Sequence, residues 1–119
     1  LSVSSVLNLT KNRKKNKKSL LRLRGRIDLL QIKDSRILIV DIKTNSTVPA
    51  SVELVSPHIM IQLELYSRIL HEAYPSHEIS TAILWTKQAS LMRIPRTLST
   101  KILNDCFMNQ VLDGEPARF

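Results

Sequence analysis

The sequence predicts an α/β (α+β) domain in which a mixed central sheet is flanked by helices. Residues 36–43 include the run Ile37-Leu38-Ile39-Val40, which is short, apolar and rich in β-branched side chains, as in a central strand buried on both faces. A helical pattern over residues 57–73 and a second strand-like segment over residues 78–86 follow. A long helix between two strands is typical of a crossover within one sheet.

The helix is predicted by its start signal and by its periodicity. Ser56 is suited to the N-cap and Pro57 to the first helical position, where its missing N–H is not needed. Pro75 ends the helix. Apolar residues at alternating steps of four and three should share one buried face. They are Ile59, Leu63, Tyr66, Leu70 and Ala73.

The remaining elements depend on shorter patterns of alternation, turn residues and charge. In chain order they are an edge strand (2–9), a loose basic hairpin loop (11–19), one strand that Asp28 ends or interrupts (20–32), a turn (33–35), a polar loop (44–51), a short strand (91–94), a terminal helix (98–112) and a loose tail (115–119).

The composition limits the possible functions. A chain of 119 residues favours a single domain over residues 1–119 with a modest core. Cys106 is the only cysteine, which excludes a disulfide framework and a cysteine-based zinc site. No apolar run approaches the ~18 residues of a membrane span, and no signal peptide is recognisable, so a cytoplasmic setting is expected. The chain begins with Leu1 rather than Met, so it is expected to be part of a longer protein.

The formal charge of +8 is concentrated near the beginning of the chain. Residues 11–26 contain many lysines and arginines and no acid. Such a segment predicts a polyanionic partner, because neutralising phosphates releases counterions. The alternative is a solvated basic loop without a partner, and the charge pattern leaves both interpretations open.

The strongest candidate for chemistry is a set of two acids and one lysine. Asp41 and Lys43 are two residues apart on the predicted strand, so they share one face, and Asp28 can lie alongside them. Two carboxylates can hold a hard divalent cation, and an ammonium can stabilise charge developing on a phosphate. The alternative is a surface ion pair, but Asp41 directly follows four apolar residues, where a carboxylate needs a partner or a metal.

Three motifs in order resemble the PD-(D/E)XK nuclease superfamily: Gly25-Arg-Ile-Asp28, then Ile39-Val-Asp41-Ile-Lys43-Thr-Asn45, then Gln62-Leu-Glu-Leu-Tyr66. More narrowly, they resemble the RecB-like nuclease domain at the C-terminal end of the AddA subunit of bacterial double-strand-break repair helicase-nucleases. Residues 82–86 and 91–95 add to that likeness, which covers about residues 20–95. The resemblance implies a restriction-endonuclease-like fold.

The resemblance also implies roles for individual residues. Asp28, Asp41 and the backbone carbonyl of Ile42 would ligate Mg²⁺ or Mn²⁺. Lys43 would orient the attacking water and stabilise the transition state. Gln62 and Tyr66 match a Gln-x-x-x-Tyr motif, in which Gln62 would position Lys43 or the nucleic acid and Tyr66 would support that arrangement.

By the same resemblance, the chain would be a Mg²⁺-dependent deoxyribonuclease, with exonuclease action, in the bacterial cytoplasm. Its partners would be DNA, the helicase domains of the parent chain and an AddB-like subunit. The basic side chains would hold DNA without reading its sequence. The candidates for that contact are Lys14, Lys15, Lys17, Lys18, Arg24 and Arg26.

Two departures from the family pattern favour an alternative function. RecB-like domains usually carry an earlier helix with a His or Glu that completes the metal site, and this first core helix is expected to be missing here. Ser4-Ser5 occupies a place where related chains tend to have an acid. The alternative is a catalytically impaired DNA-binding or assembly module that keeps the nuclease fold. A basic RNA-associated domain is a third option, but it would not explain the acids and the lysine.

Overall fold

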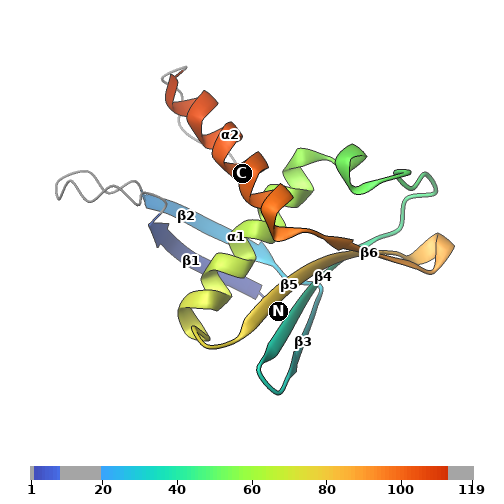
Figure 1. Cartoon of the computed structure of the whole chain (residues 1–119), viewed down its shortest axis with the longest axis horizontal. Coiled ribbons are helices and arrows are strands. Elements are labelled where there is room, and N and C mark those ends of the chain that lie inside the picture. The colour runs from blue at the N-terminus through green and yellow to red at the C-terminus, as the bar shows by residue number, and fades with distance from the viewer. Residues whose placement is uncertain (1, 9–19, 113–119) are drawn as a thin grey trace.

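A four-stranded mixed sheet forms the centre of the fold; the first long helix packs against it, and the second packs against the first helix (Figure 1). In the computed structural model, residues 2–8 and 20–112 are described, and their side chains over residues 26–108. The elements are β1 (Ser2–Asn8), β2 (Leu20–Arg26), β3 (Leu29–Lys33), β4 (Arg36–Lys43), η1 (Val52–Leu54), α1 (Pro57–Ala73), β5 (Glu78–Trp85), η2 (Thr86–Gln88), β6 (Ser90–Ile94) and α2 (Arg96–Leu112).

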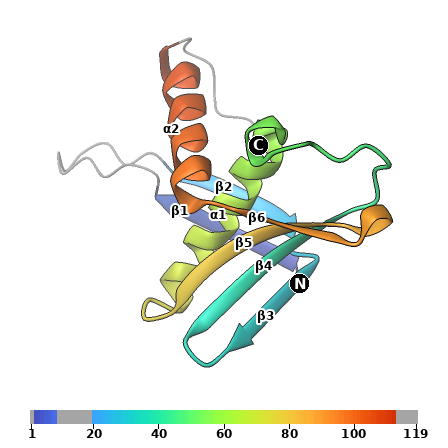
Figure 2. The same cartoon turned by 45° about the vertical axis from the view of Figure 1, so that its right-hand side comes forward.

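The order of strands in the main sheet is β3-β4-β5-β6, with β3, β4 and β5 side by side in Figure 2. The pair β4–β5 is parallel, and the pairs β3–β4 and β5–β6 are antiparallel. The connection between the two parallel strands contains α1, as the sequence predicted. This arrangement confirms the predicted fold class.

The strand pairing differs from the prediction at residues 20–32. They form two strands, with β2 paired to β1 in a separate two-stranded sheet and β3 paired to β4. The chain bends at Asp28, and the side chain of the preceding Ile27 is only 2% exposed. The prediction of one continuous strand was therefore wrong, although Asp28 interrupts the strand as expected.

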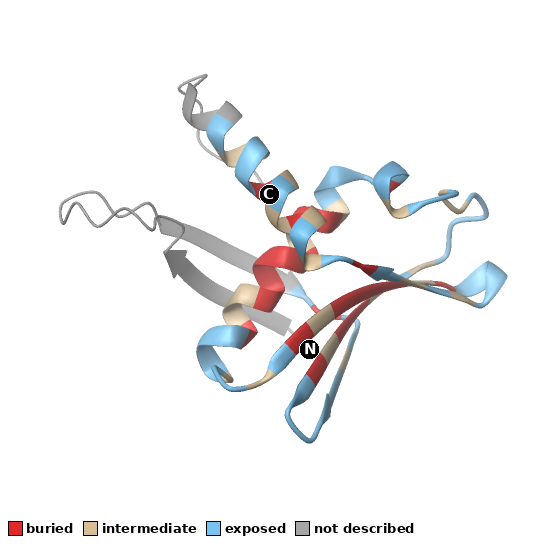
Figure 3. Ribbon diagram, in the orientation of Figure 1, coloured by how far each residue is buried: buried red, intermediate tan, exposed pale blue. Residues whose placement is uncertain are grey.

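Helix α1 begins at Pro57 after the N-cap residue Ser56, as predicted. Its buried surface is wider than one stripe, because α1 contacts β1, β4, β5 and α2. The prediction that five apolar residues share one buried face is only partly correct, because Ile59 is half-buried and Ala73 is exposed. Figure 3 shows the buried stretches of α1 and of the neighbouring strands. The buried residues of α1 are Met60, Ile61, Leu63, Glu64, Leu65, Tyr66, Ser67 and Leu70.

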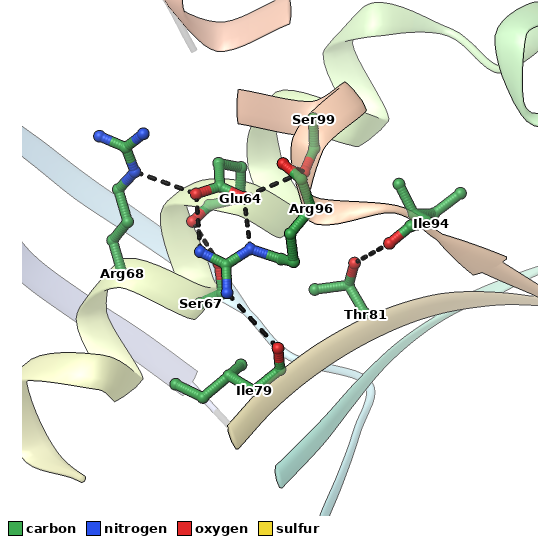
Figure 4. A network of polar contacts seen from close by, with 8 residues as sticks. All are labelled: Glu64, Ser67, Arg68, Ile79, Thr81, Ile94, Arg96 and Ser99. Atoms are coloured by element: carbon green, nitrogen blue, oxygen red, sulfur yellow. Dashed lines mark hydrogen bonds and ion pairs between the residues drawn. The ribbon is translucent and has the colours of Figure 1, made fainter. Parts of the chain in front are cut away.

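A buried carboxylate connects α1 to α2 (Figure 4). Glu64 is 1% exposed, and its two oxygens accept hydrogen bonds from Arg96 Nε at 2.7 Å and Arg96 Nη2 at 2.9 Å. Glu64 also accepts hydrogen bonds of 3.0 Å from Arg68 Nε and from the hydroxyl of Ser99. Arg96 also donates to the carbonyl of Ile79 on β5 at 3.4 Å. The cluster therefore joins both helices to the sheet, and a buried charge is compensated by donors on every side.

We expect acid to weaken the fold through Glu64. Burial opposes ionisation of this carboxyl, but the hydrogen bonds from Arg96 and Arg68 outweigh it and hold the pKa of Glu64 below its usual 4.5. A lowered pKa in the folded state gives stability that is complete above 4.5 and is lost as the pH falls through the folded value. Urea unfolding midpoints measured from pH 7 downwards should fall more steeply below about 4.5 in the wild type than in Glu64→Gln. Parallel curves would contradict this assignment.

Candidate functional site

The candidate site lies where β4 ends and the chain bends before β3. The Oδ2 atom of Asp28 accepts a hydrogen bond of 2.9 Å from the backbone N–H of Ile42. This bond links residues 14 apart in sequence and holds the Asp28 carboxylate against the end of β4. The structure thus brings Asp28 next to the strand that carries Asp41 and Lys43, as the sequence predicted.

Asp41 and Lys43 form an ion pair on that strand. The distance from Lys43 Nζ to Asp41 Oδ2 is 3.3 Å, and the side chains are 31% and 18% exposed, respectively. Burial raises the pKa of Asp41, and the nearby Asp28 carboxylate raises it further, while Lys43 opposes both effects. The net direction is upward, because burial, which disfavours the charged carboxylate, is the largest of these effects, and the Asp28 carboxylate adds a smaller one.

Two buried polar atoms without a hydrogen-bond partner in the described residues lie in this region. One is Asp41 Oδ2, and the other is the indole Nε1 of Trp85. Trp85 is the register partner of Lys43 in the parallel pair β4–β5. Asp41 Oδ2 has the Lys43 ammonium as its ion-pair partner but accepts no hydrogen bond from the described residues, and such an oxygen beside a second acid is a suitable ligand for a bound cation.

The donor set fits a small hard cation. Over residues 26–108, whose side chains are described, no three His, Cys, Asp or Glu side chains converge on one point. Asp28 and Asp41 would therefore be the two carboxylate ligands of the cation. The backbone carbonyl of Ile42 as a third oxygen ligand remains a prediction. Mg²⁺ suits such a site, because it is commonly held by one or two carboxylates and keeps several of its waters.

Gln62 and Tyr66 form a pair on α1. Gln62 Nε2 donates a hydrogen bond of 2.9 Å to the hydroxyl of Tyr66, so the two side chains meet as their spacing predicted. Tyr66 is 3% exposed, and Gln62 is half-buried. Helix α1 packs against β4, which carries Asp41 and Lys43, but the roles of Gln62 and Tyr66 in the site stay predictions.

The predicted DNA-contact residues are only partly described. Arg26 ends β2 and is exposed. Arg24 lies on β2, but its side chain is outside the described residues, and so are the loop at 11–19 and the tail at 115–119. The basic candidates Lys14, Lys15, Lys17 and Lys18 fall in that loop.

One contact at the site had no signal in the sequence. The hydroxyl of Thr86, the first residue after β5, donates to the backbone carbonyl of Lys43 at 3.2 Å. The two residues are 43 apart in sequence, so only the parallel pairing of β4 and β5 brings them together. Thr86 is the last residue of the strand predicted over residues 78–86, and nothing at that position indicated this contact.

A groove of about 680 Å³ lies elsewhere on the sheet. Its lining includes Gln31, Leu38, Ser80 and Arg93, together with residues of the β3–β4 turn, and it includes none of the candidate acids or Lys43. Leu38 and Ser80 are register partners, and Leu38 alternates along β4 with Ile37 and Ile39 of the core. The groove is therefore on the opposite face of the sheet from Asp41.

The mixed sheet and the α1 crossover place the chain in the restriction-endonuclease-like fold class. A family model described as the PD-(D/E)XK nuclease superfamily matches residues 2–106. The chain therefore belongs to this superfamily, whose nucleases generally use divalent metal ions. Comparisons with curated proteins and with solved structures gave no significant match.

In the described part of the chain, neither helix is long and apolar enough to span a membrane.

Proposed function

We propose that this chain is a metal-dependent DNA nuclease domain that hydrolyses phosphodiester bonds. One observation carries the proposal. The buried Oδ2 of Asp41 has no hydrogen-bond partner in the described residues, lies 3.3 Å from the Lys43 ammonium, and is on the strand end held by Asp28. Two carboxylates can hold a divalent cation, and an ammonium beside them can stabilise charge on a phosphate, so together they can support phosphodiester hydrolysis.

In this proposal, Asp28 and Asp41 hold the divalent cation together with the Ile42 carbonyl. Asp28 uses Oδ2 for the Ile42 amide, which leaves its other oxygen for the ion. The cation would act as a Lewis acid on a phosphate oxygen and would favour ionisation of a bound water. Mg²⁺ and Mn²⁺ both prefer oxygen ligands of this kind.

Lys43 is proposed to orient the attacking water and to stabilise negative charge on the phosphate. Its ammonium lies beside the acids, 3.3 Å from Asp41 Oδ2, and is therefore close to the proposed site of the cation and the phosphate. Gln62 and Tyr66 would support the site from α1, where their hydrogen bond fixes both side chains. Arg26 and the basic residues at positions 14, 15, 17, 18 and 24 would hold the DNA backbone.

The narrower proposal is an exonuclease that is the RecB-like domain of an AddA-type helicase-nuclease in the bacterial cytoplasm. It would then work with DNA, with helicase domains of the same chain and with an AddB-like subunit. The ordered motifs at Asp28, Asp41-Ile-Lys43 and Gln62…Tyr66 support this context.

The first test is cleavage of end-labelled linear DNA by the purified chain with Mg²⁺, with Mn²⁺ and with a chelator. We expect cleavage only with a metal, and a loss of at least about 100-fold in Asp41→Asn, because this change removes a metal-holding charge at nearly constant shape. Asp34→Asn is the matched control. Asp34 is exposed in the β3–β4 turn with a φ of 55°, which asparagine also adopts readily.

Full activity of Asp41→Asn would contradict the proposed site. A wild-type chain that binds DNA without cleaving it under any metal would favour the second candidate, a catalytically impaired DNA-binding or assembly module. The specific observation behind that candidate is that the described side chains bring two carboxylates, rather than three metal-binding groups, to the site.

A further inference from the structure

The end of β4 is held from both sides by side chains of other elements. On one side, Asp28 Oδ2 accepts the N–H of Ile42 at 2.9 Å. On the other, the Thr86 hydroxyl donates to the carbonyl of Lys43 at 3.2 Å. The bonded groups are the N–H of Ile42 and the C=O of Lys43, which is the next residue. The backbone between them includes the Cα atom from which the Lys43 side chain projects. This part of the strand is therefore restrained at both ends.

Thr86 is itself exposed, but it directly follows a residue of the core. Trp85 precedes it, is 3% exposed and belongs to the hydrophobic core. Trp85 is also the last register partner on β5, opposite Lys43. Thr86 begins η2, where β5 stops, and its side chain supplies the hydrogen bond to the Lys43 carbonyl. The core thus fixes the position of Thr86, and Thr86 fixes the last peptide group of β4.

This contact matters because Lys43 is not fixed by burial. Its side chain is 31% exposed, and the loop that follows β4 starts with the exposed residues Thr44 and Asn45. The position of the ammonium next to Asp41 therefore depends on the backbone at Lys43 and on the ion pair itself. In catalysis, a misplacement of about 1 Å can lower the rate about 100-fold.

We propose that Thr86 is a positioning residue for Lys43, and that its hydroxyl, through the Lys43 carbonyl, holds the lysine in line with the two acids. The inference depends on the proposed nuclease function of the same site. Thr86 needs no contact with DNA or metal for this role. Its loss should therefore lower the catalytic rate constant without changing the affinity for either.

The test compares Thr86→Val, which keeps the shape and removes the hydroxyl, with Thr86→Ser, which keeps the hydroxyl. Metal-dependent cleavage of end-labelled linear DNA is measured for kcat, for KM and for the Mn²⁺ concentration at half-maximal rate. We expect kcat to fall about 10-fold in Thr86→Val, with KM and the Mn²⁺ requirement unchanged, and to recover in Thr86→Ser. Thr97→Val, at an exposed threonine on α2, is the matched control and should leave kcat unchanged.

Several outcomes would overturn the inference. If Thr86→Val cleaves like the wild type, the hydroxyl has no positioning role. If Thr86→Val and Thr86→Ser lose kcat and thermal stability equally, the residue is merely structural. If Thr86→Val does not fold, Thr86→Ala and Thr86→Ser make the same comparison without the added methyl group. An active wild type with an unaffected Thr86→Val overturns only this inference, whereas an inactive wild type overturns the proposed function and this inference with it.

Discussion

A Lys43→Gln chain is expected to cleave DNA at least about 100-fold more slowly than the wild type while binding Mn²⁺ at least as tightly. The ammonium of Lys43 lies 3.3 Å from Asp41 Oδ2, where it competes with any cation for the same oxygen. Glutamine removes that competing charge and leaves both carboxylates in place. The charge that would stabilise the phosphate in the transition state is removed at the same time.

Two measurements separate these effects. Calorimetric titration with Mn²⁺ gives the affinity, and single-turnover cleavage at saturating Mn²⁺ gives the rate. Lys33→Gln is the matched control, because Lys33 is exposed at the end of β3 and makes the same change of charge away from the acids. Equal losses of Mn²⁺ affinity and of rate in Lys43→Gln would indicate that Lys43 holds the metal site together, which contradicts the proposed role in catalysis.

Arg96→Ala is expected to lower the free energy of unfolding at pH 7 by about 2–3 kcal/mol. The change removes two hydrogen bonds to a carboxylate that is 1% exposed, and it removes the contact with the Ile79 carbonyl. Breaking a fully buried pair usually costs about 3–5 kcal/mol. The expected value is smaller because the Arg96 side chain is 37% exposed and Glu64 keeps its bonds to Arg68 and Ser99.

Urea unfolding followed by far-UV circular dichroism measures this change, and Arg36→Ala is the matched control. Arg36 pairs with Glu78 at 3.8 Å, but both side chains are at least 80% exposed, so its removal should cost less than about 0.5 kcal/mol. The difference between Arg96→Ala and the wild type should shrink as the pH falls through the folded pKa of Glu64, because a protonated Glu64 no longer needs the charge. Equal effects of the two substitutions at pH 7 would contradict the assigned role of Arg96.

The sequence predicted the parts of this fold that local patterns determine. The apolar run at residues 37–40 and the Ser56-Pro57 start of α1 each contain their own structural signal, and both elements lie where they were expected. The interruption at Asp28 was expected, but the division of residues 20–33 into two strands of different sheets could not be predicted in the same way. The Asp28 carboxylate is held by a hydrogen bond from the Ile42 amide, 14 residues away, and such a long-range contact leaves no local pattern in the sequence.

The same distinction applies to the site. The shared face of Asp41 and Lys43 follows from the two-residue period of a strand, and their ion pair confirms that geometry. Glu64 lies inside the motif that contains Gln62 and Tyr66, but its burial depends on Arg96, which is 32 residues away on α2. Such a pairing is formed only by the tertiary packing of the two helices, and no local pattern in the sequence contains it.

The position of Glu64 between Gln62 and Tyr66 has a consequence for the orientation of α1. Successive side chains on a helix project about 100° apart, so Glu64 points away from Gln62 by roughly 200°. The bonds of Glu64 to Arg96 fix the rotation of α1 about its own axis, and that rotation also determines where the Gln62–Tyr66 pair points. Because α2 supplies Arg96, we expect sequence changes in α2 to alter the direction of the Gln62–Tyr66 pair on the opposite side of α1.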